Sequence, residues 1–219
     1  MEGISNEKKQ KGQFFTPRLV VDAIIDRLSN LWQIDLNGEL INVLEPSIGE
    51  GIFLISLLEK LPRLNEGIGI VSSDKSNLHL YGFDIDKKMV ELSTKRLSLF
   101  KSQFSFRSEI YHLDFLLNFH KTLNNTKFDL IIGNPPHSAS YDSQNWSILV
   151  EEHEDIVKDI YKETSVYFTL IASRLLKDNG ILVFILPKPI IDSNRWKTFR
   201  LFLLQRLKIL EICSSRGIC

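Results

Sequence analysis

The sequence predicts a single α/β domain built on a doubly wound, mostly parallel β-sheet. Short apolar runs typical of buried strands alternate along the chain with segments whose apolar residues recur at helical spacing. Glycine, proline or an acidic residue follows most of these apolar runs. In an open sheet of this kind, ligands bind at the carboxyl ends of the strands. We therefore expect the functional residues to lie in the loops that follow the strands.

The composition excludes several classes of protein. The chain has 219 residues, with 27 basic and 27 acidic side chains, so no strong overall field draws it to nucleic acid or acidic membranes. Its cysteines, Cys213 and Cys219, form no disulfide framework or metal-binding spacing, which favours a cytoplasmic protein. The longest apolar stretch, 181–186, is too short to cross a bilayer, and the N-terminus resembles no signal peptide.

The N-terminal part is expected to be a mobile arm over residues 1–12, followed by one domain over residues 13–219. Thr16 is a good helix N-cap and Pro17 a good first helical residue, so a helix is predicted from about Pro17 to Leu31. Phe14 and Phe15, just before this helix, either pack against its entry or contact a ligand.

A strand, a glycine turn and a helix follow. The strand is predicted over Ile41–Leu44, the turn over Glu45–Gly51 (EPSIGEG), and the helix from Ile52 to a stop near Pro62. Glycines in such a turn let a ligand approach the backbone. However, the two glutamates of the turn would repel a pyrophosphate. A ligand with a positive centre and an ammonium group fits this turn better.

Two further strands are predicted to end in carboxylates. Strand Leu78–Phe83 is followed by Asp84, which is well placed to accept hydrogen bonds from ribose hydroxyls, while Asp86 can cap a helix over Lys87–Phe100. A weaker strand, Glu109–Leu113, ends at Asp114 and Phe115. These two residues are either an acceptor and a cover for an adenine ring, or a surface acid and a core phenylalanine.

The fourth strand, Leu130–Ile132, leads into Gly133 and the turn Asn134-Pro135-Pro136-His137. Two prolines cannot continue the strand, and the first moves Asn134 out of the helical region. The Asn134 side-chain oxygen and the Pro135 carbonyl can both accept hydrogen bonds, which suits an exocyclic amino group. Such polarisation would make the nitrogen more nucleophilic. The alternative is a plain turn that ends the strand.

The remainder of the chain completes the alternating pattern. Residues 138–160 are predicted to be a long active-site loop containing Tyr141 and Trp146. A helix is expected over Ser165–Leu176, stopped by Asn179-Gly180, followed by a strand over Ile181–Leu186. A further helix over Ser193–Leu207 and a sixth strand over Lys208–Ile212 complete the chain. The helix over 193–207 carries the only concentrated basic set of the sequence: Arg195, Lys197, Arg200 and Arg206.

The ordered motifs resemble those of S-adenosylmethionine-dependent adenine-N6 DNA methyltransferases of restriction–modification systems. The order, with Gln13–Pro17 (QFFTP) first and the Asn-Pro-Pro turn last, is that of the gamma arrangement. The resemblance implies a Rossmann-like class I methyltransferase domain, S-adenosylmethionine as the cofactor and double-stranded DNA as a partner. It also implies a set of cofactor-binding residues: Phe15, Thr16, Pro17, Glu45, Pro46, Gly49, Gly51, Asp84, Ile85, Asp114 and Phe115.

The same resemblance assigns the target base to the last motif. Asn134 and Pro135 would bind the amino group of an adenine flipped out of the duplex, next to Pro136 and His137. The methyl group would move directly to nitrogen without a metal.

The sequence departs from the family pattern at three points. The position of His137 is usually Tyr, Phe or Trp in this family, and a neutral imidazole offers a smaller surface on which a base can stack. No aromatic follows the sixth strand, and no seventh strand or target-recognition domain follows. We therefore expect a catalytic domain that leaves sequence reading to a missing region or a separate subunit. The alternatives are a methyltransferase acting on RNA or on protein glutamine, or a non-catalytic module.

Overall fold

The strands of the structure form one parallel sheet with the order β3-β2-β1-β4-β5. The computed structural model describes residues 16–32, 40–64, 77–103, 105–137, 141–152 and 163–213. The strands are β1 (Ile41–Glu45), β2 (Leu78–Asp84), β3 (Arg107–His112), β4 (Phe128–Gly133) and β5 (Leu176–Phe184). The strand order reverses direction at β1, so the predicted doubly wound sheet is confirmed.

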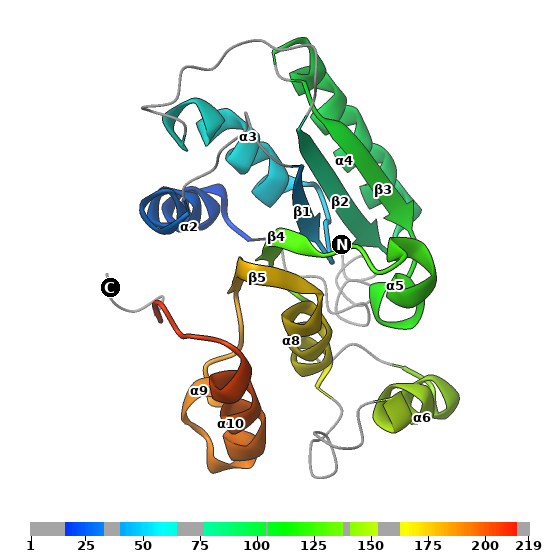
Figure 1. The fold of residues 1–219 in the computed structure, drawn as a ribbon. Helices are drawn as coiled ribbons and strands as arrows, with labels where there is room; N and C mark the ends of the chain where they lie inside the picture. Colours follow the sequence, from blue (N-terminus) through cyan, green and yellow to red (C-terminus); the bar gives the residue numbers. More distant parts are fainter. Residues whose placement is uncertain are drawn as a thin grey trace, which may run out of the picture.

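Helices cover both faces of this sheet (Figure 1). They are α2 (Arg18–Leu31), α3 (Ile52–Leu64), α4 (Lys87–Ser98), α5 (Phe115–Leu123), α6 (Ser143–Glu152), α8 (Thr164–Leu175), α9 (Pro189–Asp192) and α10 (Lys197–Arg206), with 3-10 turns η1 (Leu99–Ser102) and η2 (Asn194–Trp196). Alternation along the strands divides the core: Leu130 and Ile132 pack toward α2 and α3, whereas Ile131 packs toward α5 and α8.

Several predicted boundaries need correction. Helix α2 begins at Arg18 with Pro17 as its N-cap, so Thr16 does not cap it. Helix α3 continues past Pro62 to Leu64, and the helix after β2 ends in the 3-10 turn η1. Helix α3 thus ends two residues beyond the proline that was expected to stop it.

The segment predicted to be one long loop contains a helix. Helix α6 lies within residues 138–160, and its Trp146 is 4% exposed and packs against Tyr167 of α8. Helix α5 was not expected either, because Asp114 and Phe115 were interpreted as ligand contacts. Asp114 caps α5, whose buried face carries Leu116, Phe119 and Leu123. Tertiary burial of an apolar face stabilises both short helices.

The C-terminal elements also differ from the prediction. Helix α8 ends at Leu175 and β5 begins at once, so Asn179 and Gly180 lie inside the strand, where its register against β4 shifts. The predicted helix over 193–207 is divided between η2 and α10. The predicted sixth strand is wrong: residues 207–213 have no regular structure, and Ile209, Leu210 and Ile212 are exposed. A strand needs a paired neighbour, and these residues pair with no strand in the described part of the chain.

Candidate active site

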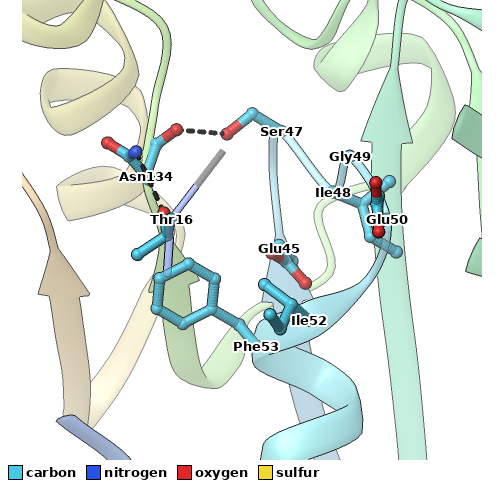
Figure 2. A pocket seen from close by; sticks show the side chains of 9 residues that line it. All are labelled: Thr16, Glu45, Ser47, Ile48, Gly49, Glu50, Ile52, Phe53 and Asn134. Carbon is cyan, nitrogen blue, oxygen red and sulfur yellow. Dashed lines mark hydrogen bonds between the residues drawn. The ribbon is translucent and has the colours of Figure 1, made fainter. Parts of the chain in front are cut away.

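The loops that follow β1, β2, β3 and β4 lie at one edge of the sheet, because all four strands run parallel. A pocket opens at this edge. Figure 2 shows Asn134 and Thr16 on one side of it, Ile48 to Glu50 on the other, and Glu45 between them. The pocket is lined by Thr16, Glu45, Ser47, Ile48, Gly49, Glu50, Ile52, Phe53 and Asn134.

The loop after β1 forms the floor of the pocket. The backbone amide of Ile48 donates to the Phe83 carbonyl at 2.8 Å, which ties this loop to β2. Gly49 has a φ of +50° and Gly51 a φ of +76°, a conformation that glycine adopts without steric cost. A Cβ on Gly51 would also come within 3.1 Å of Ser93 Cβ on α4, whereas a Cβ on Gly49 would meet no atom within 4 Å. The backbone at Gly49 is therefore open to a ligand.

Glu45 places a buried carboxyl group in the lining of the pocket. Its side chain is 1% exposed, and among the residues that the structure describes none donates a hydrogen bond to its Oε2 atom. Burial raises the pKa of this carboxyl well above its usual range, the nearby charge of Asp84 raises it further, and the backbone amide of Leu54 partly offsets both effects. A buried acceptor without a donor is costly unless a ligand supplies one. An ammonium group or another cation would do so.

Glu50, the second glutamate of the turn after β1, differs from Glu45 in having a charged partner within the protein. Glu50 lies in an ion pair with Arg96 of α4 at 2.7 Å, and the same guanidinium nitrogen donates to the Glu50 carbonyl at 3.3 Å. Glu50 is therefore neutralised by α4, and the uncompensated carboxylate of this loop is Glu45. This asymmetry favours a ligand with one cationic group deep in the pocket.

Asp84 fastens the second loop to the first. Its Oδ2 accepts from the Gly49 backbone amide at 2.9 Å, and its Oδ1 accepts from the Asp86 amide at 2.8 Å. Asp86 accepts from the Lys88 amide and caps α4, as predicted. Ile85 between them is 51% exposed. Asp84 thus places a carboxylate at the end of β2, beside the Gly49 backbone.

The Asn-Pro-Pro turn is held from three directions. The Asn134 Nδ2 donates to Thr16 Oγ1 at 3.1 Å, and Ser47 Oγ donates to the Asn134 carbonyl at 3.2 Å (Figure 2). On the other side, Thr164 of α8 donates to the Pro136 carbonyl at 2.8 Å. Pro135 is buried. The turn is therefore bound to the N-terminal motif, the β1 loop and α8 together.

His137 is half-buried at the end of this turn. Burial lowers the pKa of its imidazole, and the charge of Glu163 partly offsets that effect. The ring is therefore neutral at physiological pH, the form that can stack on an aromatic base.

The third predicted loop is arranged differently from the expectation. Asp114 is half-buried, and its Oδ2 accepts from the Tyr141 hydroxyl at 2.8 Å. Burial raises the pKa of Asp114, and the bond from Tyr141 lowers it. Phe115 is 2% exposed and stacks on Phe168 of α8 at 5.4 Å. Phe115 is therefore part of the hydrophobic core and is not among the residues that line the pocket.

Sequence reasoning missed several pocket residues. Ser47, Ile48 and Glu50 lie inside the glycine-rich motif and could have been included with it. Ile52 and Phe53 begin α3, and nothing in the sequence distinguished them from ordinary helix residues. Phe15 and the predicted arm over residues 1–12 lie outside the described residues.

Two other kinds of feature were sought over the described ranges alone. Within them, no three histidine, cysteine or acidic side chains gather as metal ligands. Within the same ranges, no helix has the length and apolar character needed to cross a membrane.

Comparison with known proteins identifies the family. The model of the Eco57I restriction-modification methylase family matches residues 78–217, and the chain belongs to this family. The chain is 27% identical to modification methylase CviBIII of Paramecium bursaria Chlorella virus NC1A over 99% of its own length. It is 28% identical to a release factor glutamine methyltransferase of Bacillus cereus over 46% of its length, which is 39% of that protein.

The fold has similar solved structures. A putative class I S-adenosylmethionine-dependent methyltransferase of Listeria monocytogenes superposes with a TM-score of 0.66 at 18% identity, covering 90% of this chain and 53% of that one. S-adenosylmethionine is therefore the cofactor of the protein class to which this chain belongs. The chain spans 48% of the length of the CviBIII enzyme, about half of that relative.

Proposed function

We propose that residues 13–219 form the catalytic domain of a DNA methyltransferase that modifies the N6 amino group of adenine. The observation that carries the proposal is the position of the Asn134 carboxamide. It lies beside the pocket that contains Glu45, in a turn whose main-chain carbonyl groups are fixed by neighbouring loops.

The pocket fits S-adenosylmethionine, which supplies a methyl group on a positively charged sulfur. Glu45 would accept hydrogen bonds from the ammonium group, satisfying the Oε2 atom that has no partner. Gly49 would let the ligand approach the backbone. Gly51 would bind the cofactor indirectly, by allowing the close contact with α4 that shapes this turn, with Pro46 in the same turn. Thr16, next to Pro17 and Phe15, would border the methionine end.

The nucleoside part of the cofactor would extend along the sheet edge. Asp84 would accept from the ribose hydroxyls while remaining bonded to Gly49. The exposed Ile85 side chain would cover the adenine ring, and Asp114 would accept from its amino group. Because Phe115 is buried in the core, it would support this region from below.

The target amino group would be held by Asn134 and Pro135. The Asn134 Oδ1 and the Pro135 carbonyl would accept hydrogen bonds from the two N–H groups of the target amino group. This would leave the nitrogen lone pair available to attack the methyl carbon. A nitrogen–carbon bond would form as the sulfur–carbon bond of the cofactor breaks, with the bonding electron pair left on sulfur, and one amino proton would then leave to solvent. The adenine must be flipped out of the duplex to reach this position, and the neutral His137 ring would stack on it.

Recognition of the DNA sequence would come from outside this chain segment. The chain has no net charge, and phosphate contacts supply most of the affinity of proteins for DNA. Since the chain spans about half of a full-length relative, a target-recognition region or a separate specificity subunit would supply these contacts.

A second candidate is methylation of protein glutamine. The match to a release factor glutamine methyltransferase favours it, because a glutamine side chain also presents an NH2 group that two acceptors can hold. The N-terminal Phe-Thr-Pro motif and the match of nearly the whole chain to CviBIII favour DNA.

The product distinguishes these candidates. The purified chain is incubated with labelled S-adenosylmethionine and DNA that lacks N6-methyladenine, and the nucleosides are analysed by mass spectrometry. N6-methyladenine that is absent with the Asn134→Ala variant supports the proposal. Label found on cytosine, or on glutamine of a release factor offered in parallel, would contradict it.

A further inference from the structure

A side-chain amide has two ends of similar size and opposite character: Oδ1 accepts hydrogen bonds, and Nδ2 donates them. For Asn134 to bind an amino group, Oδ1 must face the substrate. A half-turn of the amide would present N–H groups to N–H groups and block productive binding. The orientation of this carboxamide therefore has to be selected by its surroundings.

Two hydroxyl groups from distant parts of the chain contact Asn134 (Figure 2). Thr16 Oγ1 accepts from Nδ2 at 3.1 Å across a sequence separation of 118 residues. Ser47 Oγ donates to the main-chain carbonyl at 3.2 Å across a separation of 87 residues. The first contact holds the amide by its Nδ2 end and leaves Oδ1 on the side away from Thr16, and the second fixes the backbone that carries the side chain.

Thr16 does not serve as the N-cap of α2. A threonine just before a helix normally caps it, but the N-cap of α2 is Pro17, and no side chain donates or accepts there. The Thr16 hydroxyl instead contacts Asn134 on the same side of the pocket.

We propose that Thr16 and Ser47 are positioning residues that set the Asn134 carboxamide with Oδ1 toward the substrate amino group. The proposal rests on the methyl transfer proposed above. Both residues also line the pocket proposed for the cofactor. The same two hydroxyls would therefore border the cofactor and position the Asn134 carboxamide, which holds the amino group that receives the methyl group.

Thr16→Val tests the role of the hydroxyl at nearly constant volume. Loss of this hydrogen bond should lower kcat about tenfold, equivalent to about 1.4 kcal/mol. The contribution of Thr16 to cofactor binding is measured separately, as the S-adenosylmethionine Kd of the same variant. Thr16→Ser keeps the hydroxyl and should retain most of kcat. Thr169→Val is the matched control, because it removes a buried hydroxyl whose partner lies within α8.

A second measurement does not depend on activity. In protein labelled with 15N at asparagine, the side-chain amide signal of Asn134 is identified by its loss in Asn134→Ala. The proton that bonds to Thr16 should exchange slowly with solvent in the wild-type protein and in Thr16→Ser. In Thr16→Val it should exchange faster, with Ser47→Ala showing a smaller effect.

The outcomes separate the two proposals. A wild-type protein that methylates DNA adenine, together with a Thr16→Val variant of unchanged kcat and unchanged amide exchange, would overturn the positioning role alone. A wild-type protein that transfers no methyl group to adenine would overturn the proposed function, and the amide exchange would still decide whether Thr16 orients Asn134.

Discussion

Glu45 and Asn134 perform separable tasks at the scale of single residues. Glu45 is a buried carboxylate without a hydrogen-bond donor for Oε2, positioned for the cation of a ligand. Asn134 is held by its Nδ2 end beside the same pocket. The cofactor should depend on the first residue and the methyl acceptor on the second.

Glu45→Gln should stabilise the protein and weaken cofactor binding. Burial raises the folded-state pKa of Glu45 above its ordinary value of 4.5. Stability from the protonated form is therefore complete below pH 4.5 and lost as the pH rises through the folded-state pKa. Glutamine does not ionise, so the Glu45→Gln variant should keep this stability at neutral pH. Its melting temperature near pH 7.5 should rise by about 2–4 °C for each 1 kcal/mol of stability that it retains over the wild type.

Calorimetric titration measures the other half of this prediction. Replacement of the carboxylate should weaken S-adenosylmethionine binding by about 1.5–3 kcal/mol, the usual contribution of a hydrogen bond to a charged group. A variant that is less stable at neutral pH, or that binds the cofactor as well as the wild type, would refute the assignment of Glu45.

Asn134→Ala should abolish methyl transfer and leave cofactor binding nearly intact. The alanine lacks both the acceptor for the substrate amino group and the donor to Thr16. Transfer is followed with labelled cofactor, and binding by fluorescence or calorimetry. Loss of both properties together would show that the turn is only structural.

At the scale of elements, α4 holds the cofactor loop through Arg96, which pairs with Glu50. Both side chains are partly exposed, so the pair contributes modestly. Arg96→Ala should weaken S-adenosylmethionine binding by about twofold to fivefold, as expected for loss of a partly exposed ion pair. The exposed neighbour Lys95→Ala is the control and should bind normally. An equal effect in both variants would indicate a general loss of charge.

The segment after the catalytic turn is tied to the third loop by Tyr141 and Asp114. Tyr141→Phe leaves a half-buried carboxylate with one donor fewer, so the protein should lose about 1–2 kcal/mol of stability at neutral pH. Without this donor the raised pKa of Asp114 rises further, and stability from its protonated form is lost as the pH increases.

Urea unfolding at two pH values checks this prediction. The deficit of Tyr141→Phe should be larger at pH 7.5 than at pH 4.5, and it should lose its pH dependence in a D114N background. An equal deficit at both pH values would mean that the two side chains do not interact.

The elements that sequence reasoning identified are those whose signals are local. Apolar runs followed by glycine or an acidic residue marked β1, β2 and β4, and their alternation with helices indicated a parallel sheet. Helices α5 and α6 were missed because their signals competed with ligand-binding interpretations of Phe115 and Tyr141. The false sixth strand shows that an apolar run specifies a strand only where the fold provides a partner.

The site was predictable to a similar degree. Glu45, Gly49 and Asn134 were identified from motifs and do lie at one pocket. Their mutual contacts were not predictable: pairing of Glu50 with Arg96, and of Thr16 with Asn134, depends on how α4 and α2 pack. Sequence motifs indicate which residues act, and tertiary packing decides which of them touch.

At the scale of the whole molecule, a chain of zero net charge should bind DNA weakly by itself. We expect salt-dependent binding no tighter than the non-specific range of about 10⁻⁴–10⁻⁶ M, without sequence preference. Filter binding or fluorescence anisotropy at two salt concentrations measures it. Tight, sequence-specific binding by this chain alone would place target recognition within residues 13–219.

The most direct test of the central claim is calorimetric titration of S-adenosylmethionine into the wild-type chain, Glu45→Gln and Asn134→Ala. The account predicts binding of the wild type at about micromolar affinity, roughly −8 kcal/mol. It predicts nearly the same affinity for Asn134→Ala and a clearly weaker one for Glu45→Gln. A folded wild-type chain that does not bind, or equal losses in both variants, would contradict the division of the pocket between cofactor and methyl acceptor.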